Sequence, residues 1–462
     1  MKKIFMLMFL VVIIPVVLLL LLFARSPQRF ELTLKKPAKN APVSLEPSGA
    51  AVGSSVSDDE IQAILEAVAK AKSGLKGKPH YAYVAFTVRY DAKKIHDELK
   101  KQLGDDVKIH GMTSSFGVMT NKGLHVGKTG SLAILLVSSP DIKFGVSGID
   151  LDDFGSTQEA GKTAVLKALA DAGKSTNDAP PDIILMSGTF VAGDEVKMLD
   201  GIAEVVGKET PVIGGNAGDE TLTGIWKQMT GQAVYKKGLV LTAIYTDRKI
   251  GWEFESRFKV TDVSGIATKA KNNVIYEIDN KPALDVYDQW LGGGLYEKIE
   301  KLGYNEVVGY TARHPLAREL RGDKGAMAFC CVHPAPTPAD LAAKKLTLGT
   351  TIEEGSKIYL MASNWQAIIS RSEKVPEEAL RRGLIKSKDG EFGIFVVCTG
   401  MAMSVPPQER FKIPLLVNNV LGDIPFIGVF THGEQGPVPG IRNINANLVE
   451  SLVVIGKEAK EK

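Results

Sequence analysis

Apolar residues recur with two different periods from residue 57 onward, and segments of the two kinds alternate along the chain. Residues 57–60, SDDE, form a capping box, and apolar positions at helical spacing follow from Ile61, which predicts a helix that ends near Gly74. A β-rich run at 81–90 precedes a second helical pattern that stops at Gly104. The alternation continues with strands at 107–110, 131–138, 142–146 and 182–186 and with helices from about 156 and 194. Such mixing predicts a layered fold, α/β to α+β, with mixed β-sheets flanked by helices.

The pattern changes after Gly251, where a second domain is expected. Residues 266–278 predict a hairpin that turns at Asn272-Asn273, and a short helix is expected from Pro282. Strands recur at 358–362, 393–397, 424–430 and 448–455. The folded parts expected from these patterns are two layered domains and a charged tail, at 57–250, 251–457 and 458–462.

The N-terminus contains a long apolar run. Residues 4–24 carry no charge, and about 20 apolar residues are enough to cross a bilayer as a helix. A cleaved signal peptide has a shorter apolar region of roughly 7 to 15 residues, so an uncleaved single-pass anchor at 1–25 is expected. Residues 26–56, rich in Pro, Ser and Ala, predict a linker. Basic residues at 25–39 favour a cytoplasmic soluble part. A short tail before a single span usually stays inside, however, so we expect the soluble part to be extracytoplasmic.

Charge and composition disfavour several classes of function. The 462 residues include 56 basic and 53 acidic side chains, for a net charge of +3 and no long basic block, so nucleic acid is not an expected partner. Neither the three cysteines nor the seven histidines show metal-ligand spacing, and no metal or cofactor is expected. Two segments look like phosphate loops, but residues 122–129 continue into a strand, and residues 188–193 precede Asp194 and Glu195, which would repel phosphate. No catalytic signature demands an enzyme.

Four glycine-rich polar segments follow apolar runs, and they carry the candidate chemistry. They are IHGMTSSFG, PVIGGNAGDE, CTG and FTHGEQGP, at 109–117, 211–220, 398–400 and 430–437. Free backbone N–H groups, hydroxyls and carboxylates at strand ends favour a site for a small polar molecule. Tight turns alone would explain the glycine, asparagine and serine of any single segment.

Several of these segments resemble a known family. PVIGGNAGD (211–219) looks like the signature of the FIST N domain, and residues 110–116 lie where that family carries a Gly-Cys-Ser/Thr turn, with Met112 in place of the cysteine. NVIYEIDNKPALDVY (273–287) and IPFIGVFTHGEQGP (424–437) resemble the start and the closing segment of FIST C, and the match extends from about Asp58 to Gly456. VCTGM (397–401) departs from the family's Ser-Cys-x-Gly-Arg turn. Met401 stands where an arginine would hold an anionic ligand group.

The resemblance implies a sensory module of signal transduction that binds small ligands such as amino acids. An unidentified signalling partner is then expected, because no kinase, cyclase or other output domain is recognisable in the chain. We expect Asn216 and Asp219 to lie opposite His432 and Glu434 in the ligand site. The full set of candidate ligand-binding residues is Thr113, Ser114, Gly214, Gly215, Asn216, Gly218, Asp219, Cys398, Thr399, His432, Gly433 and Glu434.

Two other classes of function remain open. Cys398 could act as a nucleophile with His432 as its base, in an enzyme of unknown reaction. An interaction module without a ligand could instead reach its partner through an exposed edge strand.

Overall fold

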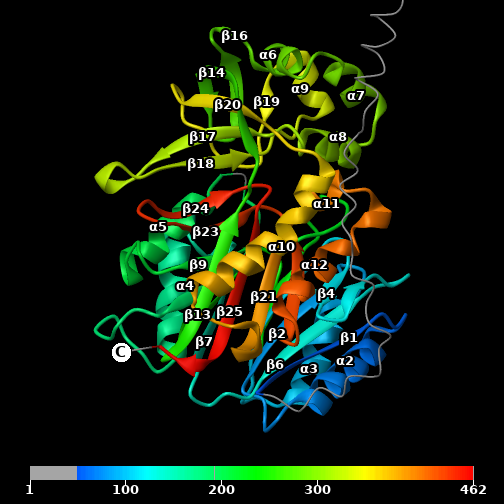
Figure 1. Ribbon diagram of the computed structural model, residues 1–462, viewed down its shortest axis with the longest axis vertical. Coiled ribbons are helices and arrows are strands. Elements are labelled where there is room, and N and C mark those ends of the chain that lie inside the picture. The colour runs from blue at the N-terminus through cyan, green and yellow to red at the C-terminus, as the bar shows by residue number, and fades with distance from the viewer. Residues whose placement is uncertain (1–48, 192, 461–462) are drawn as a thin grey trace, which may run out of the picture. The chain divides into compact units, whose positions relative to one another are not determined.

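The structure is a computed structural model that describes residues 49–191 and 193–460. Within these residues the strands form four sheets flanked by helices, which confirms the expected mixed α/β architecture (Figure 1). Three of these sheets each contain one parallel pair of strands, and the remaining pairs are antiparallel.

The first sheet comes from the N-terminal part of the chain and has the order β1-β6-β2-β3-β10-β11. Helices α2 (Glu60–Gly74) and α3 (Ala92–Leu103) cover one face, where Ile64 and Leu99 pack with Ile134 in one apolar cluster. The strands are β1 (Ala50–Ser55), β6 (Leu132–Val137), β2 (Tyr81–Phe86), β3 (Lys108–Thr113), β10 (Gln228–Thr230) and β11 (Val234–Tyr235).

The second sheet has the order β24-β23-β9-β8-β12-β7. Helices α4 (Thr157–Asp171) and α5 (Glu195–Val206) pack on it through a cluster that includes Val165, Met198 and Ile184. The strands are β24 (Arg442–Ala446), β23 (Glu434–Val438), β9 (Val212–Asn216), β8 (Ile183–Gly188), β12 (Gly238–Tyr245) and β7 (Lys143–Asp150).

The third sheet has the order β13-β25-β21-β22-β4-β5. Helices α10 (Trp365–Arg382), α11 (Thr399–Ser404) and α12 (Lys412–Leu421) pack against it, and a further cluster joins Tyr83, Leu185 and Val453 of the three sheets. The strands are β13 (Arg248–Glu255), β25 (Glu450–Ala459), β21 (Gly390–Cys398), β22 (Phe426–Thr431), β4 (Val118–Thr120) and β5 (Gly123–His125).

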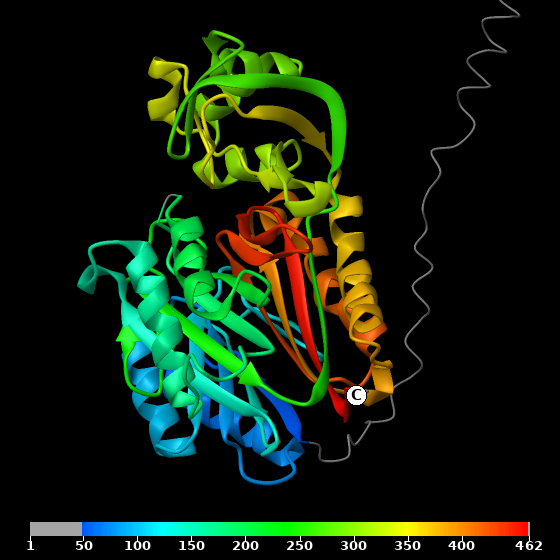
Figure 2. The same cartoon turned by 90° about the vertical axis from the view of Figure 1, so that its left-hand side faces the viewer.

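The fourth sheet is antiparallel, has the order β16-β15-β14-β20-β17-β18, and lies with four helices at one end of the described residues (Figures 1 and 2). Its strands are β16 (Lys281–Pro282), β15 (Val274–Ile278), β14 (Lys259–Lys271), β20 (Lys357–Ala362), β17 (Leu316–Arg321) and β18 (Met327–Val332), with β19 (Leu346–Thr347) paired to β15. The helices are α6 (Ala283–Trp290), α7 (Leu295–Lys301), α8 (Tyr304–Thr311) and α9 (Pro338–Ala343).

The two halves of the chain exchange strand pairs. The hairpin β4–β5 of the first half joins the third sheet, where Met119 pairs with Gly428 of β22. In return, the hairpin β23–β24 of the second half joins the second sheet, where Glu434 pairs with Gly215 of β9. The halves at 57–250 and 251–457, expected as successive domains, are therefore interleaved in space.

Local sequence signals explain where several elements begin. Ser156 caps α4 by accepting a hydrogen bond from the Glu159 N–H, at the start of the helix that the sequence predicts from about residue 156. The first helix is capped by Asp59 instead of Ser57, because the Asp59 carboxylate accepts the N–H of Gln62 at 2.7 Å. Asn272 turns the β14–β15 hairpin with a φ of 55°, a conformation that asparagine tolerates well.

Two expectations about the ends of the chain need correction. The predicted linker extends to residue 56, whereas residues 50–55 form β1, an edge strand that pairs antiparallel with β6. The prediction of a membrane protein with an extracytoplasmic soluble part is wrong: among the described residues, no helix is long and apolar enough to cross a bilayer. The expected span at 1–25 lies outside the described residues.

Candidate ligand-binding site

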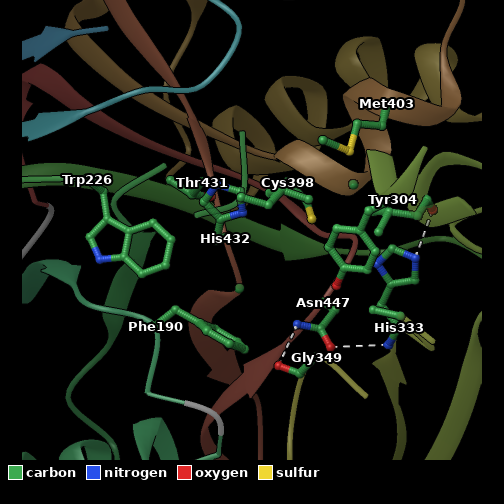
Figure 3. A pocket seen from close by; sticks show the side chains of 15 residues that line it. Phe190, Trp226, Tyr304, His333, Gly349, Cys398, Met403, Thr431, His432 and Asn447 are labelled. Atoms are coloured by element: carbon green, nitrogen blue, oxygen red, sulfur yellow. Dashed lines mark hydrogen bonds between the residues drawn. The ribbon is translucent and has the colours of Figure 1, made fainter. Parts of the chain in front are cut away.

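A pocket of about 140 Å³ lies where the fourth sheet and its helices meet the ends of β21 and β22 (Figure 3). Because β21 and β22 are parallel neighbours, their last residues, Cys398 and Thr431, lie side by side at one sheet edge. α8 contributes Tyr304 from the opposite wall. The lining residues of the described chain are Phe190, Leu222, Trp226, Tyr304, Val308, His333, Ala335, Gly349, Cys398, Gly400, Met403, Thr431, His432, Gly433 and Asn447.

His432 is a neutral hydrogen-bonding group at this site. The backbone N–H of Asp219 donates to its Nε2 at 3.0 Å, and the Asp219 carbonyl oxygen and Ser115 Oγ lie 3.1 and 3.3 Å from the same nitrogen. Burial lowers the pKa of His432 to about 4, since a charged ring would lose its hydration. The Trp226 ring lies 5.6 Å from the imidazole, measured between ring centroids.

Cys398 and Glu434 form a buried pair beside the pocket. Thr431 Oγ1 donates to Glu434 Oε1 at 2.9 Å, and the Val449 N–H lies 3.4 Å from Oε2. Burial raises the pKa of Glu434 above its usual range, and burial together with the neighbouring carboxyl raises that of Cys398. Both groups are therefore held in their protonated, uncharged forms near neutral pH. Cys398 lines the pocket, whereas Glu434 lies behind it.

Asn216 joins the end of β9 to the turn at Gly433. Its N–H donates to the Gly433 carbonyl and its carbonyl accepts the His432 N–H, each at 3.0 Å. The side-chain amide lies 3.3 Å from Glu195 Oε1 and accepts from Gln435 at 3.5 Å, so it is one layer behind the lining. Burial raises the pKa of Glu195.

The Asp219 carboxylate organises the loop that follows β9. Its Oδ1 accepts the N–H groups of Thr221 and Thr223, and its Oδ2 accepts those of Gly224 and Ile225, at distances of 2.9 to 3.2 Å. Partial burial alone would raise the pKa of Asp219, but these hydrogen bonds and that of the Thr221 hydroxyl lower it on balance. The loop so held carries Leu222 and leads to Trp226, both of which line the pocket.

The glycines of the 211–220 segment serve close packing instead of a turn. Gly214 and Gly215 lie inside β9, where an added Cβ would come within 1.8 Å of the Met186 carbonyl oxygen and 2.6 Å of Thr431. A Cβ on Gly218 would meet Ser115 Oγ at 2.4 Å. Glycine permits such a close backbone approach, so a tight turn is not what explains these glycines.

The remaining predicted residues hold the two halves together or hold the loops. Ser114 Oγ accepts the Phe430 N–H at 2.9 Å, and Thr113 Oγ1 accepts the Lys227 N–H at 3.0 Å. Thr399 Oγ1 lies 2.8 Å from Ser115 Oγ, at the start of α11. Of the twelve predicted residues, Cys398, His432 and Gly433 are the ones that line the pocket.

Several lining residues lie outside the segments that the sequence singled out, notably Phe190, Tyr304, His333 and Asn447. Asn447 Oδ1 accepts the His333 N–H at 3.1 Å, and its amide nitrogen lies 3.4 Å from the Gly349 carbonyl oxygen. Burial lowers the pKa of His333 to about 4. The sequence gives one signal for this wall: asparagine recurs at every second residue, at 443, 445 and 447, which is the spacing of one face of a strand. All three side chains are buried in the structure, and buried polar groups form hydrogen-bond networks.

Two family models match the chain: the FIST N domain over residues 81–281 and the FIST C domain over residues 283–437. The chain belongs to the FIST family. FIST domains are sensory, ligand-binding domains of signalling proteins. The boundary between the two matches falls at the start of α6, so the pocket of this FIST chain takes Phe190 and Trp226 from the first domain and Cys398 and His432 from the second.

Other comparisons add little. No curated protein matches the FIST chain. Two cyanuric acid hydrolase structures, one from A. caulinodans, are each 9% identical to it with a TM-score of 0.32, and cover 88–89% of this chain and 99–100% of theirs. Phosphoribosylformylglycinamidine synthase II from Thermotoga maritima is 11% identical with a TM-score of 0.21, covering 90% of this chain and 76% of its own. Likenesses this weak carry no argument about function.

Proposed function

We propose that this FIST chain is a sensory module of signal transduction that binds an amino acid or a similar small polar metabolite in the pocket at the ends of β21 and β22. One observation carries the proposal: residues of both FIST domains and of α8 converge on a pocket of about 140 Å³. Concave sites with a few convergent polar groups are the usual hosts of small ligands.

The proposal gives the residues around the pocket two kinds of role. His432 and Asn447 supply hydrogen-bonding groups at the lining. Asp219, Asn216 and Glu434 hold the loops and strand ends that carry the lining, through the hydrogen bonds described above. A ligand would therefore contact the first group and depend on the second for pocket shape.

Ligand binding in this pocket would shift the equilibrium between different arrangements of the two FIST domains and α8. The ligand would touch Trp226 of the first FIST domain, Tyr304 of α8 and His432 of the second domain together. A ligand shifts a conformational equilibrium only through contacts that differ between states, and these three residues come from a loop, a helix and a turn in different parts of the fold. The signal would then pass to a separate partner.

The enzyme alternative receives little support from the environment of Cys398. A cysteine nucleophile acts as a thiolate and needs a depressed pKa, whereas burial raises the pKa of this thiol. The imidazole that would serve as its base is a weak one, because burial lowers its pKa to about 4, and its Nε2 already accepts the Asp219 N–H.

A thermal-unfolding screen of the full chain against amino acids and other small polar metabolites tests the proposal. A ligand at about 100 times its dissociation constant adds roughly 2.7 kcal/mol to the free energy of unfolding. The shift should disappear in Trp226→Ala, which removes a lining ring, and persist in Trp290→Ala, a half-buried tryptophan outside the pocket. If no compound raises the melting temperature, an interaction module without a ligand becomes the better reading.

A further inference from the structure

The pocket presents hydrogen-bonding groups but no fixed charge. None of its described lining residues is a lysine, arginine, aspartate or glutamate. The two histidines that line it, His333 and His432, are neutral at neutral pH because burial lowers the pKa of each to about 4. An ion that enters such a site loses hydration without gaining a counter-charge, which costs several kcal/mol. Uncharged ligands are favoured.

The volume and shape of the pocket narrow the class of ligand further. A cavity of roughly 150 Å³ is large enough to hold a benzene molecule, and this pocket has about 140 Å³. Trp226 and Tyr304 lie on opposite sides of the open space, with Phe190 between them (Figure 3). Aromatic side chains bind planar rings through stacked or edge-to-face contacts. The walls therefore suit a single flat ring.

The polar groups at one edge suit an amide. Asn447 accepts the His333 N–H with its carbonyl oxygen and lies with its amide nitrogen 3.4 Å from the Gly349 carbonyl oxygen, so its side-chain amide keeps one further N–H and one further lone pair. A donor and an acceptor side by side can satisfy the paired acceptor and donor of an uncharged amide. A carboxylate has no donor for the Asn447 carbonyl oxygen, and an ammonium group has no acceptor for the Asn447 N–H, so each would leave one group of the amide unpaired.

We propose that the pocket selects an uncharged, planar, single-ring molecule that carries an amide group, and that it discriminates against charged analogues and zwitterionic amino acids of the same size. The inference rests on the proposed ligand-binding function and, of the two ligand classes named there, favours small polar metabolites over amino acids. Two charges lie outside the lining but near it. The Asp219 carboxylate acts on His432, and Arg371 of α10 is buried behind Met401, with Nη1 3.2 Å from its Sδ. An attraction of Arg371 for anions is the competing expectation that the experiment has to exclude.

Three compounds with one ring and different charges separate these outcomes. Benzamide is uncharged, benzoate is an anion and benzamidine is a cation, and each is titrated calorimetrically into the full chain at neutral pH alongside leucine and glutamate. Benzamide should bind, and the charged compounds and amino acids should bind at least about tenfold more weakly, which is about 1.4 kcal/mol. Binding of benzamide should be lost in Trp226→Ala and retained in Trp290→Ala.

A charge placed in the lining gives the reverse test. Met403→Lys adds a cation at the wall of the pocket, so it should improve binding of benzoate relative to benzamide. Tighter binding of benzoate to the unmodified chain would overturn the inference in favour of Arg371. Binding of amino acids without binding of benzamide would overturn it and leave the proposed function intact. If neither the three ring compounds nor the two amino acids bind, both the inference and the proposed function fail.

Discussion

The backbone N–H of Asp219 donates a hydrogen bond to Nε2 of His432 at 3.0 Å, and these residues belong to the two glycine-rich segments that resemble the FIST N and FIST C signatures. The same segments pair as strands, because Gly214 of β9 lies opposite Gln435 of β23. The two signatures are therefore neighbours in one sheet, although more than two hundred residues separate Asp219 from His432.

Removing the His432 acceptor should destabilise the protein and weaken ligand binding together. In His432→Phe the ring is kept but the Asp219 N–H loses its partner, and a buried unpaired donor costs about 1–3 kcal/mol. Urea unfolding measures the loss, and His314→Phe, at a half-buried histidine outside the pocket lining, serves as the matched control. An unchanged free energy of unfolding in His432→Phe would mean that this bond does not hold the loop.

Asp219→Asn should act through the loop at 220–225. The Oδ1 position keeps its bonds from Thr221, but an amino group in the place of Oδ2 would face the N–H groups of Gly224 and Ile225. We expect a loss of about 2 kcal/mol in unfolding free energy and weaker binding through displacement of Trp226. Denaturant unfolding checks the first effect, and the exposed Asp262→Asn should leave it unchanged. Weaker binding at full stability would instead place the Asp219 carboxylate in contact with the ligand.

Local signals were sufficient to predict several elements of the fold. The Ser156 side chain caps a helix three residues away, and the tolerance of Asn272 for a positive φ turns a hairpin at its own position. Both signals are local, so they are visible in the sequence. The pairing of Met119 with Gly428 has no such signal, since the choice of a distant strand partner depends on packing across the whole fold. The exchange of hairpins between the halves was therefore not predictable from local patterns.

Some residues of the candidate site were likewise predictable from local sequence patterns, and others were not. Cys398 and His432 were found because glycine-rich polar loops at strand ends are visible in the sequence. Tyr304 and His333 were missed, because their place at the pocket follows from the docking of the fourth sheet and α8. The role of the glycines in β9 was not predictable, since a sequence does not distinguish glycines that need a positive φ in a turn from glycines that allow close packing.

Gly214→Ala should lower stability more than a change confined to a binding loop. Its Cβ would lie 1.8 Å from the Met186 carbonyl oxygen, so β8 and β9 would have to move apart, at a cost of about 3 kcal/mol or more. Gly155→Ala is the matched control, because an added Cβ there meets nothing within 4 Å. Thermal unfolding of both variants decides the point, and equal melting temperatures would contradict the packing argument.

Cys398 should react slowly with thiol reagents at neutral pH. Burial raises the pKa of each of the three cysteines, Cys330, Cys331 and Cys398, so little thiolate is present in the folded protein. A disulfide reagent such as dithiodipyridine should label all three rapidly in urea and none rapidly in the native state. Fast native labelling that disappears in Cys398→Ser would revive the nucleophile hypothesis.

The buried ionisable groups predict a stability maximum in mildly acidic solution. Burial raises the pKa of Glu450 to about 8 and raises that of Glu434, so the folded state keeps protons that the unfolded chain loses above its ordinary glutamate pKa of 4.5. These groups therefore destabilise the protein as pH rises towards 8. His333 and His432, with pKa values of about 4 against an ordinary 6.5, destabilise it as pH falls from 6.5 to 4.

Between pH 4.5 and 6.5 the two effects oppose each other, whereas above pH 6.5 the carboxyl groups act without opposition from the histidines. Each fully buried carboxyl contributes a slope of about 1.4 kcal/mol per pH unit there. Urea unfolding from pH 4 to 8.5 measures the profile. Glu450→Gln keeps the acceptor for Ser372 and should reduce the dependence of the unfolding free energy on pH above 6.5 by the contribution of one carboxyl group. The exposed Glu209→Gln should leave this dependence unchanged. An alkaline slope that is identical in Glu450→Gln and the parent chain would show that Glu450 is ionised in the folded state.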